Sequence, residues 1–444
     1  MTPPGLEIPA GQEIPGGLEI REKSGQKRSP LSCPRIYLHI GEPKTGTTFL
    51  QDAMWHNRSR MAAQGVLLPG YSHQDHARAS RDLRGAPRAA RDPAAPWIGD
   101  WDVLARQARH APETAVISNE LLAACDARQA SQAVRSLLPA EVHIILTVRD
   151  FATLLPAEWQ ERIKCRDTVQ WEEWLDRVVG AEPDAGRRHR SWFWNVHDTL
   201  AILDAWSQHL PPDHVHVVTI PQHARADLLW ERFMTALGLD PGGADLAPAR
   251  SNASLGIPET EFLRRMNEAL PADVPDWFYT RNIKRVLAHE VLAGQPGQPR
   301  LALPVSRQAW AREQAETLVA GLRDAKYHVV GDPDDLLPPR LTGHRTGPAG
   351  HHADPASWSA ELLLDTAVRA AAAFADRQYR QLRPAPRPRP RLGAPRQLAV
   401  RLVWRTLNGR RLTRALRQAS HRPAVRRLRV AIWCALTHPA RHHT

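Results

Sequence analysis

Short apolar runs of strand-forming residues recur through the middle of the chain, with helical patterns between them. The most strand-like run covers residues 142–148, and its apolar character predicts a central strand buried on both faces of a parallel sheet. Similar runs predict strands at 35–41, 115–118, 215–220 and 327–330. Strands that alternate with helices predict an α/β fold in which helices cover both faces of a parallel sheet.

The helical patterns complete this organisation. Helices are predicted at 47–63, 101–110, 127–138, 154–164, 171–179, 196–209 and 226–237, within most of 258–325, and in the Ala-rich segment 357–382. Residues 72–97 are polar and interrupted by proline, which predicts a loop. The domain organisation predicted from these patterns is a disordered leader (1–34), an α/β domain (35–340), a linker with the Ala-rich helix (341–382), and a basic amphipathic tail (383–444).

Charge is distributed unevenly along the chain. Residues 383–444 contain sixteen arginines and no Lys, Asp or Glu, so this tail has a formal charge of +16. Because the whole chain has a formal net charge of +12, residues 1–382 carry −4. A mildly acidic body argues against a nucleic-acid-binding domain. Four cysteines without a CxxC spacing favour a reduced, cytoplasmic compartment, and no apolar run is long enough to predict a membrane span.

The most informative motif is the loop after the first predicted strand, Gly41-Glu-Pro-Lys44-Thr-Gly46-Thr47-Thr48. It precedes a helix start, where free N–H groups favour an anion. Its glycines have the spacing of a Walker A loop, but Thr47 stands in place of the Walker lysine and Lys44 lies inside the loop. The strand at 142–148 leads to Arg149, so a Walker B carboxylate is not evident. A simple turn with a capping box between Thr48 and Gln51 is the alternative.

The segment from His39 to Gln51 resembles the 5′-phosphosulfate loop of sulfotransferases that use 3′-phosphoadenosine 5′-phosphosulfate (PAPS). Residues 147–160, 215–221, 229–233 and 329–338 resemble a bacterial, actinobacterial-like branch of that family. The resemblance covers roughly residues 35–340. It implies a P-loop-like α/β sheet with a helical lid, PAPS as the sulfuryl donor, and transfer to a hydroxyl or amine without a metal ion.

The resemblance assigns roles to particular residues. Lys44 would act in catalysis and bind PAPS, together with the nucleotide-binding residues Thr45, Gly46, Thr47, Thr48 and Arg149. Glu120 resembles the catalytic glutamate of the carbohydrate branch and would accept a proton, with His39, Glu42 and His76 as weaker candidates. The acceptor is unidentified; a carbohydrate or glycolipid is the first expectation.

Two features depart from the family pattern. Ala157 stands where the family has a serine that helps Arg149 to hold the 3′-phosphate, with Gln160 and Lys164 as possible replacements, and the late GxxGxxK element is absent. A P-loop kinase, or a non-catalytic adaptor tethered by its basic tail, therefore remains an alternative function.

The tail places leucines at three- to four-residue intervals between arginines, as basic amphipathic helices do. It would pack on the body or on a second subunit, bind an anionic membrane surface, or bind nucleic acid, in that order of expectation. The membrane alternative would make the protein peripheral on the inner membrane face. The histidine pairs at 351–352 and 442–443 lack spaced partner ligands, so no metal site is predicted.

Overall fold

The computed structural model describes residues 33–85, 99–180, 191–222, 224–247, 254–293, 300–338 and 360–382. Within these ranges six strands form one sheet in the order β2-β3-β1-β4-β5-β6, and all neighbouring pairs are parallel. The strands are β1 (Arg35–Gly41), β2 (Val66–Leu67), β3 (Thr114–Ser118), β4 (Glu141–Arg149), β5 (Val215–Ile220) and β6 (His328–Val330). The predicted α/β fold with a parallel sheet is confirmed.

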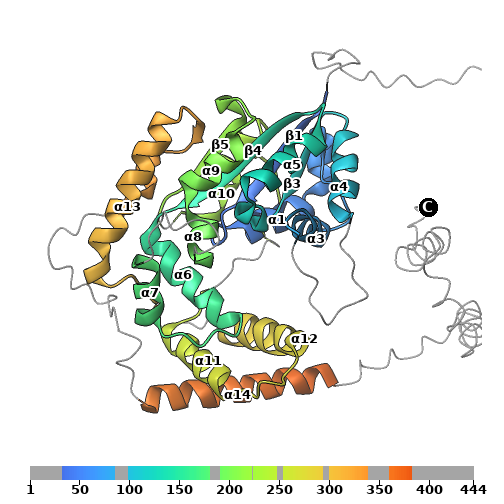
Figure 1. Cartoon of the computed structure of the whole chain (residues 1–444). Helices are drawn as coiled ribbons and strands as arrows, with labels where there is room; N and C mark the ends of the chain where they lie inside the picture. The colour runs from blue at the N-terminus through green and yellow to red at the C-terminus, as the bar shows by residue number, and fades with distance from the viewer. Residues whose placement is uncertain are drawn as a thin grey trace, which may run out of the picture. The chain divides into compact units, whose positions relative to one another are not determined.

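Helices flank the sheet, as Figure 1 shows. The α-helices are α1 (Thr47–His56), α2 (Arg58–Ala63), α3 (His73–Leu83), α4 (Asp100–Arg109), α5 (Ala127–Leu137), α6 (Phe151–Lys164), α7 (Trp171–Val179), α8 (Trp192–His197), α9 (Thr199–Ser207), α10 (Ala226–Ala236), α11 (Ile257–Ala269), α12 (Asp276–Phe278), α13 (Val305–Asp324) and α14 (Ala360–Leu382). In the described ranges, three short 3₁₀-helices are η1 (Glu120–Ala124), η2 (Pro212–His214) and η4 (Pro333–Leu336), and one π-helix is η3 (Tyr279–Leu292).

The central strands are buried on both faces because apolar side chains alternate between two clusters. Ile36 and Leu38 of β1 belong to the larger cluster, which includes side chains of α5 and α9. Tyr37, on the opposite face, belongs to the smaller cluster with side chains of α1 and α10. This burial explains why β1 and β4 read as apolar runs in the sequence.

Three sequence predictions need correction in detail. The helix predicted at 47–63 is divided into α1 and α2 at Asn57, whose side-chain amide donates to the Ala53 carbonyl at 2.9 Å. The helix predicted at 196–209 begins earlier and is divided into α8 and α9 at Asp198, which caps α9 by accepting from the Ala201 amide. The predicted loop at 72–97 contains α3, which begins with a capping box between Ser72 and Asp75.

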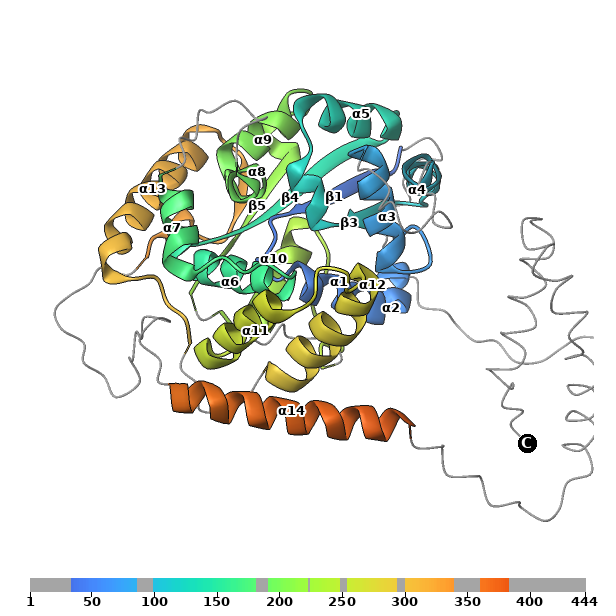
Figure 2. The same cartoon turned by 60° about the horizontal axis from the view of Figure 1, so that its bottom comes forward.

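Helices α11 and η3 lie beside α6, below the sheet in Figure 2. Asn267 of α11 donates to the Ile163 carbonyl at 2.8 Å, and Tyr279 of η3 donates to Asn267 Oδ1 at 2.7 Å, so α6, α11 and η3 are hydrogen-bonded together. The Ala-rich helix predicted at 357–382 is present as α14. Internal contacts divide the chain into residues 1–376 and 377–444, and all six strands of the described sheet belong to the first unit.

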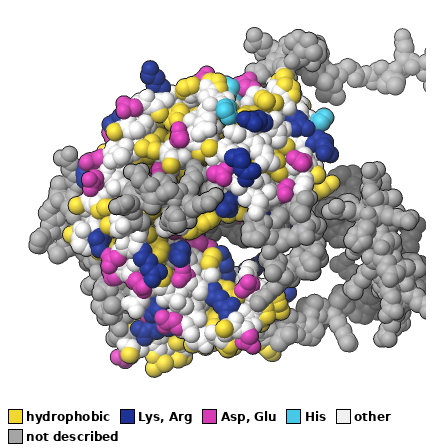
Figure 3. Space-filling model, in the orientation of Figure 1, with side chains coloured by type: hydrophobic (Ala, Val, Ile, Leu, Met, Phe, Trp, Pro, Cys, Tyr) yellow, Lys and Arg dark blue, Asp and Glu magenta, His cyan; other side chains and the backbone are white. Residues whose placement is uncertain are grey.

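Surface charge on the described body is mixed in sign. Figure 3 shows dark blue and magenta side chains interspersed over the visible face, in keeping with the small net charge of residues 1–382. Among the described helices, none is both long and apolar enough to cross a membrane. Residues 1–32 of the predicted leader, residues 341–359 of the predicted linker and the tail at 383–444 lie outside the described residues, so their predicted character stays a prediction.

Candidate functional site

The loop between β1 and α1 contains three residues in the left-handed backbone conformation, with positive φ angles. Gly41, Lys44 and Gly46 have φ angles of 115°, 62° and 82°. A Cβ atom on Gly46 would lie 2.4 Å from Leu229 Cδ2, so a side chain here would have to displace Leu229 and would also strain the backbone. Left-handed turns of this kind direct successive backbone N–H groups into a concavity that suits an anion.

Helix α1 begins from this loop without a polar side chain at its start. Its N-cap is Gly46, no side chain caps it, and its first turn contains no acidic residue. The alternative in which Thr48 and Gln51 form a capping box is wrong, because Gln51 Nε2 instead donates to Glu120 Oε2 at 3.2 Å. The unsatisfied N–H groups and the positive end of the helix dipole therefore remain available for an anion at Thr47 and Thr48.

Thr45 and Arg149 support the loop from behind. Thr45 Oγ1 donates to the Glu42 carbonyl at 2.5 Å and lies 2.5 Å from Thr147 Oγ1 on β4. Arg149 Nη1 donates to the Lys44 carbonyl at 3.0 Å, while its buried Nε has no hydrogen-bond partner. Burial lowers the pKa of Arg149, and neighbouring Asp150 opposes that shift. These two predicted PAPS ligands hold the loop backbone, and their contact with a nucleotide stays a prediction.

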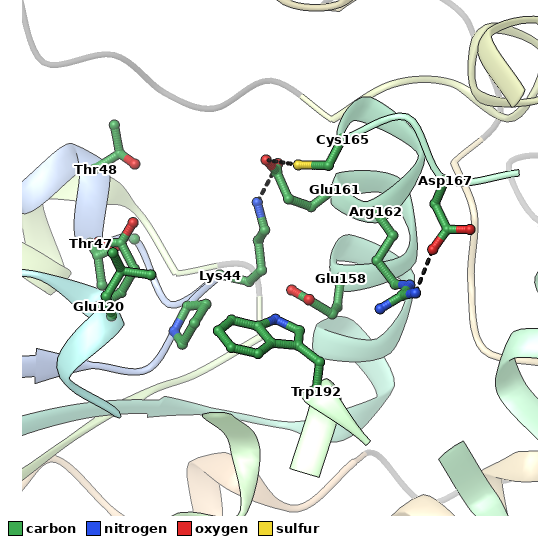
Figure 4. A pocket seen from close by; sticks show the side chains of 13 residues that line it. Lys44, Thr47, Thr48, Glu120, Glu158, Glu161, Arg162, Cys165, Asp167 and Trp192 are labelled. Carbon is green, nitrogen blue, oxygen red and sulfur yellow. Dashed lines mark hydrogen bonds and ion pairs between the residues drawn. The ribbon is translucent and has the colours of Figure 1, made fainter. Parts of the chain in front are cut away.

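A cavity of about 450 Å³ opens in front of the loop (Figure 4). Thr47, Thr48 and Glu120 lie on one side of it, and residues of α6 lie on the other, with Lys44 between them. The remaining lining residues include Glu158, Glu161, Arg162, Cys165, Asp167 and Trp192. Lys44, Gly46, Thr47, Thr48 and Glu120 are thus brought together as predicted from the sequence.

Three of the six lysines in the chain meet at one carboxylate, and we call these residues the lysine cluster. Glu161 lies 2.5 Å from Lys44 Nζ, 3.2 Å from Lys164 Nζ and 2.7 Å from Lys284 Nζ. Lys44 and Glu161 line the cavity, whereas Lys164 is almost completely buried, with 6% of its side chain exposed. One negative charge among three ammonium groups leaves an excess of two positive charges beside the loop.

The pKa values in the lysine cluster show how it is balanced. Burial favours the protonated form of Glu161, but Lys44, Lys164 and Lys284 outweigh burial and hold its pKa far below the ordinary range. Burial and the neighbouring ammonium groups lower the pKa of Lys164, because Glu161 compensates them only in part. An anion bound beside these ammonium groups would relieve the repulsion among them, so the lysine cluster favours negative charge in its part of the cavity.

Glu120, the predicted proton acceptor, lies beside the loop. It begins η1 one residue after the end of β3, and it lines the cavity while its carboxylate accepts from Gln51. Gly41 makes room for this approach, because a Cβ atom there would lie 3.2 Å from Glu120 Cα. The loop and the candidate base are therefore in direct contact.

A second cavity carboxylate, Glu158, is connected to Glu42 by the buried side chain of His197, and sequence reasoning missed this arrangement. Thr199 Oγ1 donates to Glu42 Oε1 at 2.5 Å, His197 Nδ1 lies 3.3 Å from Glu42 Oε2, and His197 Nε2 lies 3.7 Å from Glu158 Oε2. Burial alone would lower the pKa of His197, but Glu158 and Glu42 outweigh it and raise the pKa to about 9. The imidazolium is thus held between two carboxylates, and Glu158 faces the cavity.

The other weaker candidates for the base, His39 and His76, are hydrogen-bonded to protein groups outside the cavity. His39 is fully buried, lies 2.7 Å from Ser118 Oγ through Nδ1, and has its pKa lowered to about 3 by burial. His76 uses Nε2 to donate to the Pro69 carbonyl and Nδ1 to accept from the Ser118 amide. Neither ring lines the cavity, so both are structural groups in the described chain.

The expected replacements for the missing serine differ in their positions. Ala157 is partly exposed on α6, and Gln160 donates to the Leu255 carbonyl at 2.8 Å. Lys164 pairs with Glu161 in the lysine cluster and is almost completely buried, so a contact of either residue with a phosphate stays a prediction.

Sequence reasoning missed Glu158, Glu161, Lys284, His197 and Trp192. A signal for the first two was present, because Glu158, Glu161 and Cys165 recur at helical spacing on the face of α6 that lines the cavity. Contacts from η3 and α8 to this face depend on the tertiary fold and had no local signal. Comparison with models of protein families, with curated proteins and with solved structures finds no match.

Proposed function

We propose that the protein is a PAPS-dependent sulfotransferase with a P-loop-like fold, which transfers a sulfuryl group to a hydroxyl, or less readily an amine, of its acceptor. The observation that carries the proposal is Lys44. It lies inside a Gly/Thr loop at an uncapped helix start and points across the cavity to Glu161, where two further lysines supply excess positive charge. A carbohydrate or glycolipid is the acceptor class that we propose, by analogy with the family.

The chemistry requires charge stabilisation at one bridging oxygen. In an in-line transfer the S–O bond to the nucleotide breaks as the S–O bond to the acceptor forms, so negative charge develops on the oxygen of the leaving phosphate. Lys44 would exchange its contact with Glu161 for that oxygen. The α1 amides and the hydroxyl groups of Thr47 and Thr48 would donate to the phosphate and sulfuryl oxygens.

The acceptor must lose one proton as the new bond forms. Glu120 is the proposed base because its carboxylate lies beside the loop and is bound by the neutral amide of Gln51. Glu158 is a less suitable base, since its carboxylate already pairs with the buried imidazolium of His197. The acceptor hydroxyl would thus lie beside Glu120, and the donor would lie between the start of α1 and the lysine cluster.

The environment of Asp150 disfavours the kinase alternative. This carboxylate follows β4 where a Walker B residue would be sought, but it caps α6 by accepting from the Thr153 amide and also accepts from Gln222, both at 2.9 Å. It does not line the cavity. We therefore propose that donor binding requires no divalent metal ion, and that charge is balanced by the lysine cluster.

An assay of donor turnover tests the proposal. The full-length protein is incubated with PAPS and a panel of sugar, phenol and amine acceptors, and release of adenosine 3′,5′-bisphosphate is followed with and without Mg²⁺. We expect metal-independent release that a hydroxyl acceptor accelerates. Mg²⁺-dependent phosphoryl transfer from ATP would replace the proposal with the kinase, and binding of neither nucleotide would favour the adaptor.

A further inference from the structure

Histidines gather at the end of the sheet opposite to the loop. His143 on β4, His216 on β5 and His328 on β6 lie on adjacent strands near their amino ends, and His214 directly precedes β5. The candidate site described above lies at the carboxyl ends of the same parallel strands. The two groups of residues are therefore separate, and an inference about the histidines does not rest on the proposed function.

We propose that Glu141, His143 and His214 form a binding site for a divalent transition-metal ion of the Zn²⁺ class. Glu141 Oε1 lies 2.8 Å from His143 Nε2 and 3.8 Å from His214 Nε2, and the three atoms lie within 4.8 Å of one another. In a tetrahedral Zn²⁺ site with bonds near 2.1 Å, ligand atoms are about 3.4 Å apart. The observed separations lie on both sides of this value, so the side chains must adjust to enclose an ion.

The hydrogen bond of His214 prepares it as a ligand. His214 Nδ1 lies 3.0 Å from the Val142 carbonyl, which can only accept, so the proton is on Nδ1. In the neutral ring, Nε2 then carries the lone pair, on the side of Glu141. In metal-binding histidines, the nitrogen that does not bind the metal usually donates a hydrogen bond of this kind to a backbone carbonyl or a carboxylate.

His143 can give up its Nε2 proton because a chain of imidazoles accepts a shift of tautomers. Without an ion, Nε2 of His143 donates to Glu141, and its Nδ1 accepts from His216 Nε2 at 3.0 Å. His216 Nδ1 lies 2.8 Å from His328 Nδ1, and His328 is exposed. Reversing both hydrogen bonds leaves Nε2 of His143 free for an ion. Each ring remains neutral, and one proton is released from His143 while the solvent side of His328 takes one up.

The ring positions define what must move. His143 and His214 stack with centroids 4.1 Å apart and planes inclined by 21°, so one ring must turn before both lone pairs point at one ion. His214 and Glu141 have 22% and 46% of their side chains exposed, which leaves them free to adjust and leaves a fourth position to water. The charge of nearby Arg35 acts on Glu141 and opposes a cation, so we expect weaker binding than in a structural Zn²⁺ site.

Titration of the metal-free, full-length protein tests this site. ZnCl₂ is titrated by calorimetry, and CoCl₂ is titrated by visible absorption, because tetrahedral Co²⁺ gives a distinct spectrum. The wild-type chain is compared with His214→Ala and Glu141→Gln, whose side chains are partly exposed. His209→Ala is the matched control, since His209 is an exposed histidine outside the cluster. A His442→Ala/His443→Ala variant accounts for ions bound by the terminal histidine pair.

We expect His214→Ala to lose one equivalent of Zn²⁺, with affinity weakened about 100-fold or more, and to lose the tetrahedral Co²⁺ spectrum. His209→Ala and the terminal variant should retain both. Thermal unfolding of each variant without metal checks that the fold is intact. A wild-type chain without a tetrahedral Co²⁺ spectrum, or a folded His214→Ala variant that retains every equivalent, would overturn the proposal.

Discussion

At the residue scale, Lys44 is the ammonium group of the lysine cluster that lines the cavity. Its contact with Glu161 at 2.5 Å keeps it extended across the cavity when no donor is bound. If the ammonium group of Lys44 moves to the leaving oxygen as negative charge develops there, it stabilises the transition state more than it stabilises the bound donor.

We predict that Lys44→Ala lowers turnover by a factor of about 10² to 10³ and weakens nucleotide binding less, because its contact strengthens at the transition state. Steady-state kinetics with PAPS and direct binding of the product nucleotide measure the two effects. Lys326→Gln is the matched control, since Lys326 is exposed and lies outside the cluster. Equal turnover by Lys44→Ala and the control would remove Lys44 from the reaction.

Two cavity carboxylates can be distinguished by matched amide substitutions. We predict that Glu120→Gln abolishes most transfer while product-nucleotide binding is kept, because the amide retains the shape but cannot accept a proton. Glu158→Gln should retain most of the transfer, although it disturbs the pairing of His197. If Glu158→Gln were inactive and Glu120→Gln active, the base would be Glu158.

The buried His197 predicts a pH dependence of stability. Its pKa is raised from 6.5 to about 9 in the folded chain, so its contribution to the free energy of unfolding is fully present below 6.5 and is lost as the pH rises through about 9. The loss amounts to at most about 3 kcal/mol. Urea unfolding at several pH values between 6.5 and 9 should show this decline in the wild-type chain and a flatter profile in His197→Gln. An equal decline in both chains would assign the effect to other groups.

At the element scale, the loop between β1 and α1 depends on the packing of α10 against it. Leu229 of α10 occupies the space beside Gly46, and Arg149 at the end of β4 holds the Lys44 carbonyl. The shape of the loop is therefore imposed by neighbouring elements as well as by its own glycines.

We predict that Gly46→Ala destabilises the protein by about 1–3 kcal/mol, because alanine is strained at a φ of 82° and its Cβ collides with Leu229. Gly46→Ala/Leu229→Ala removes the collision and retains the backbone strain. Relative to the sum of the two single substitutions, the double variant should therefore recover part of the stability in denaturant unfolding. Strict additivity of the two losses would mean that the collision does not occur.

Most elements could be predicted from the sequence because the strands are apolar and the helices periodic. The bounds of β1, α7 and β5 agree with the predicted runs. The divisions at Asn57 and Asp198 were not predicted, since a polar residue within a helical pattern does not itself end a helix. Helix α3 was missed because its polar composition outweighed the capping residues at its start.

At the scale of the whole molecule, the candidate site combines residues that are distant in sequence. Lys44 and Glu120 were predictable because each follows a strand, and parallel strands end at the same edge of a sheet. Lys284 was not predictable, because it reaches Glu161 only through the packing of η3 against α6. The scarcity of lysine made each lysine notable but did not indicate which of them meet.

The Arg-rich tail at 383–444 lies outside the described residues, and its predicted association with an anionic membrane surface stays a prediction. The site itself belongs to the α/β unit, since every residue of the cavity and of the lysine cluster precedes residue 377. Nucleotide binding should therefore not depend on the tail.

The central claim is that the lysine cluster and the uncapped start of α1 bind a 3′,5′-bisphosphorylated adenosine without a metal ion. Calorimetric titration of the full-length protein with adenosine 3′,5′-bisphosphate, with Mg²⁺ and then with a chelator, measures this claim directly. The account predicts one binding site of equal affinity under both conditions, and much weaker binding of adenosine 5′-monophosphate. Binding that requires Mg²⁺, or a preference for ATP over the bisphosphate, would contradict it.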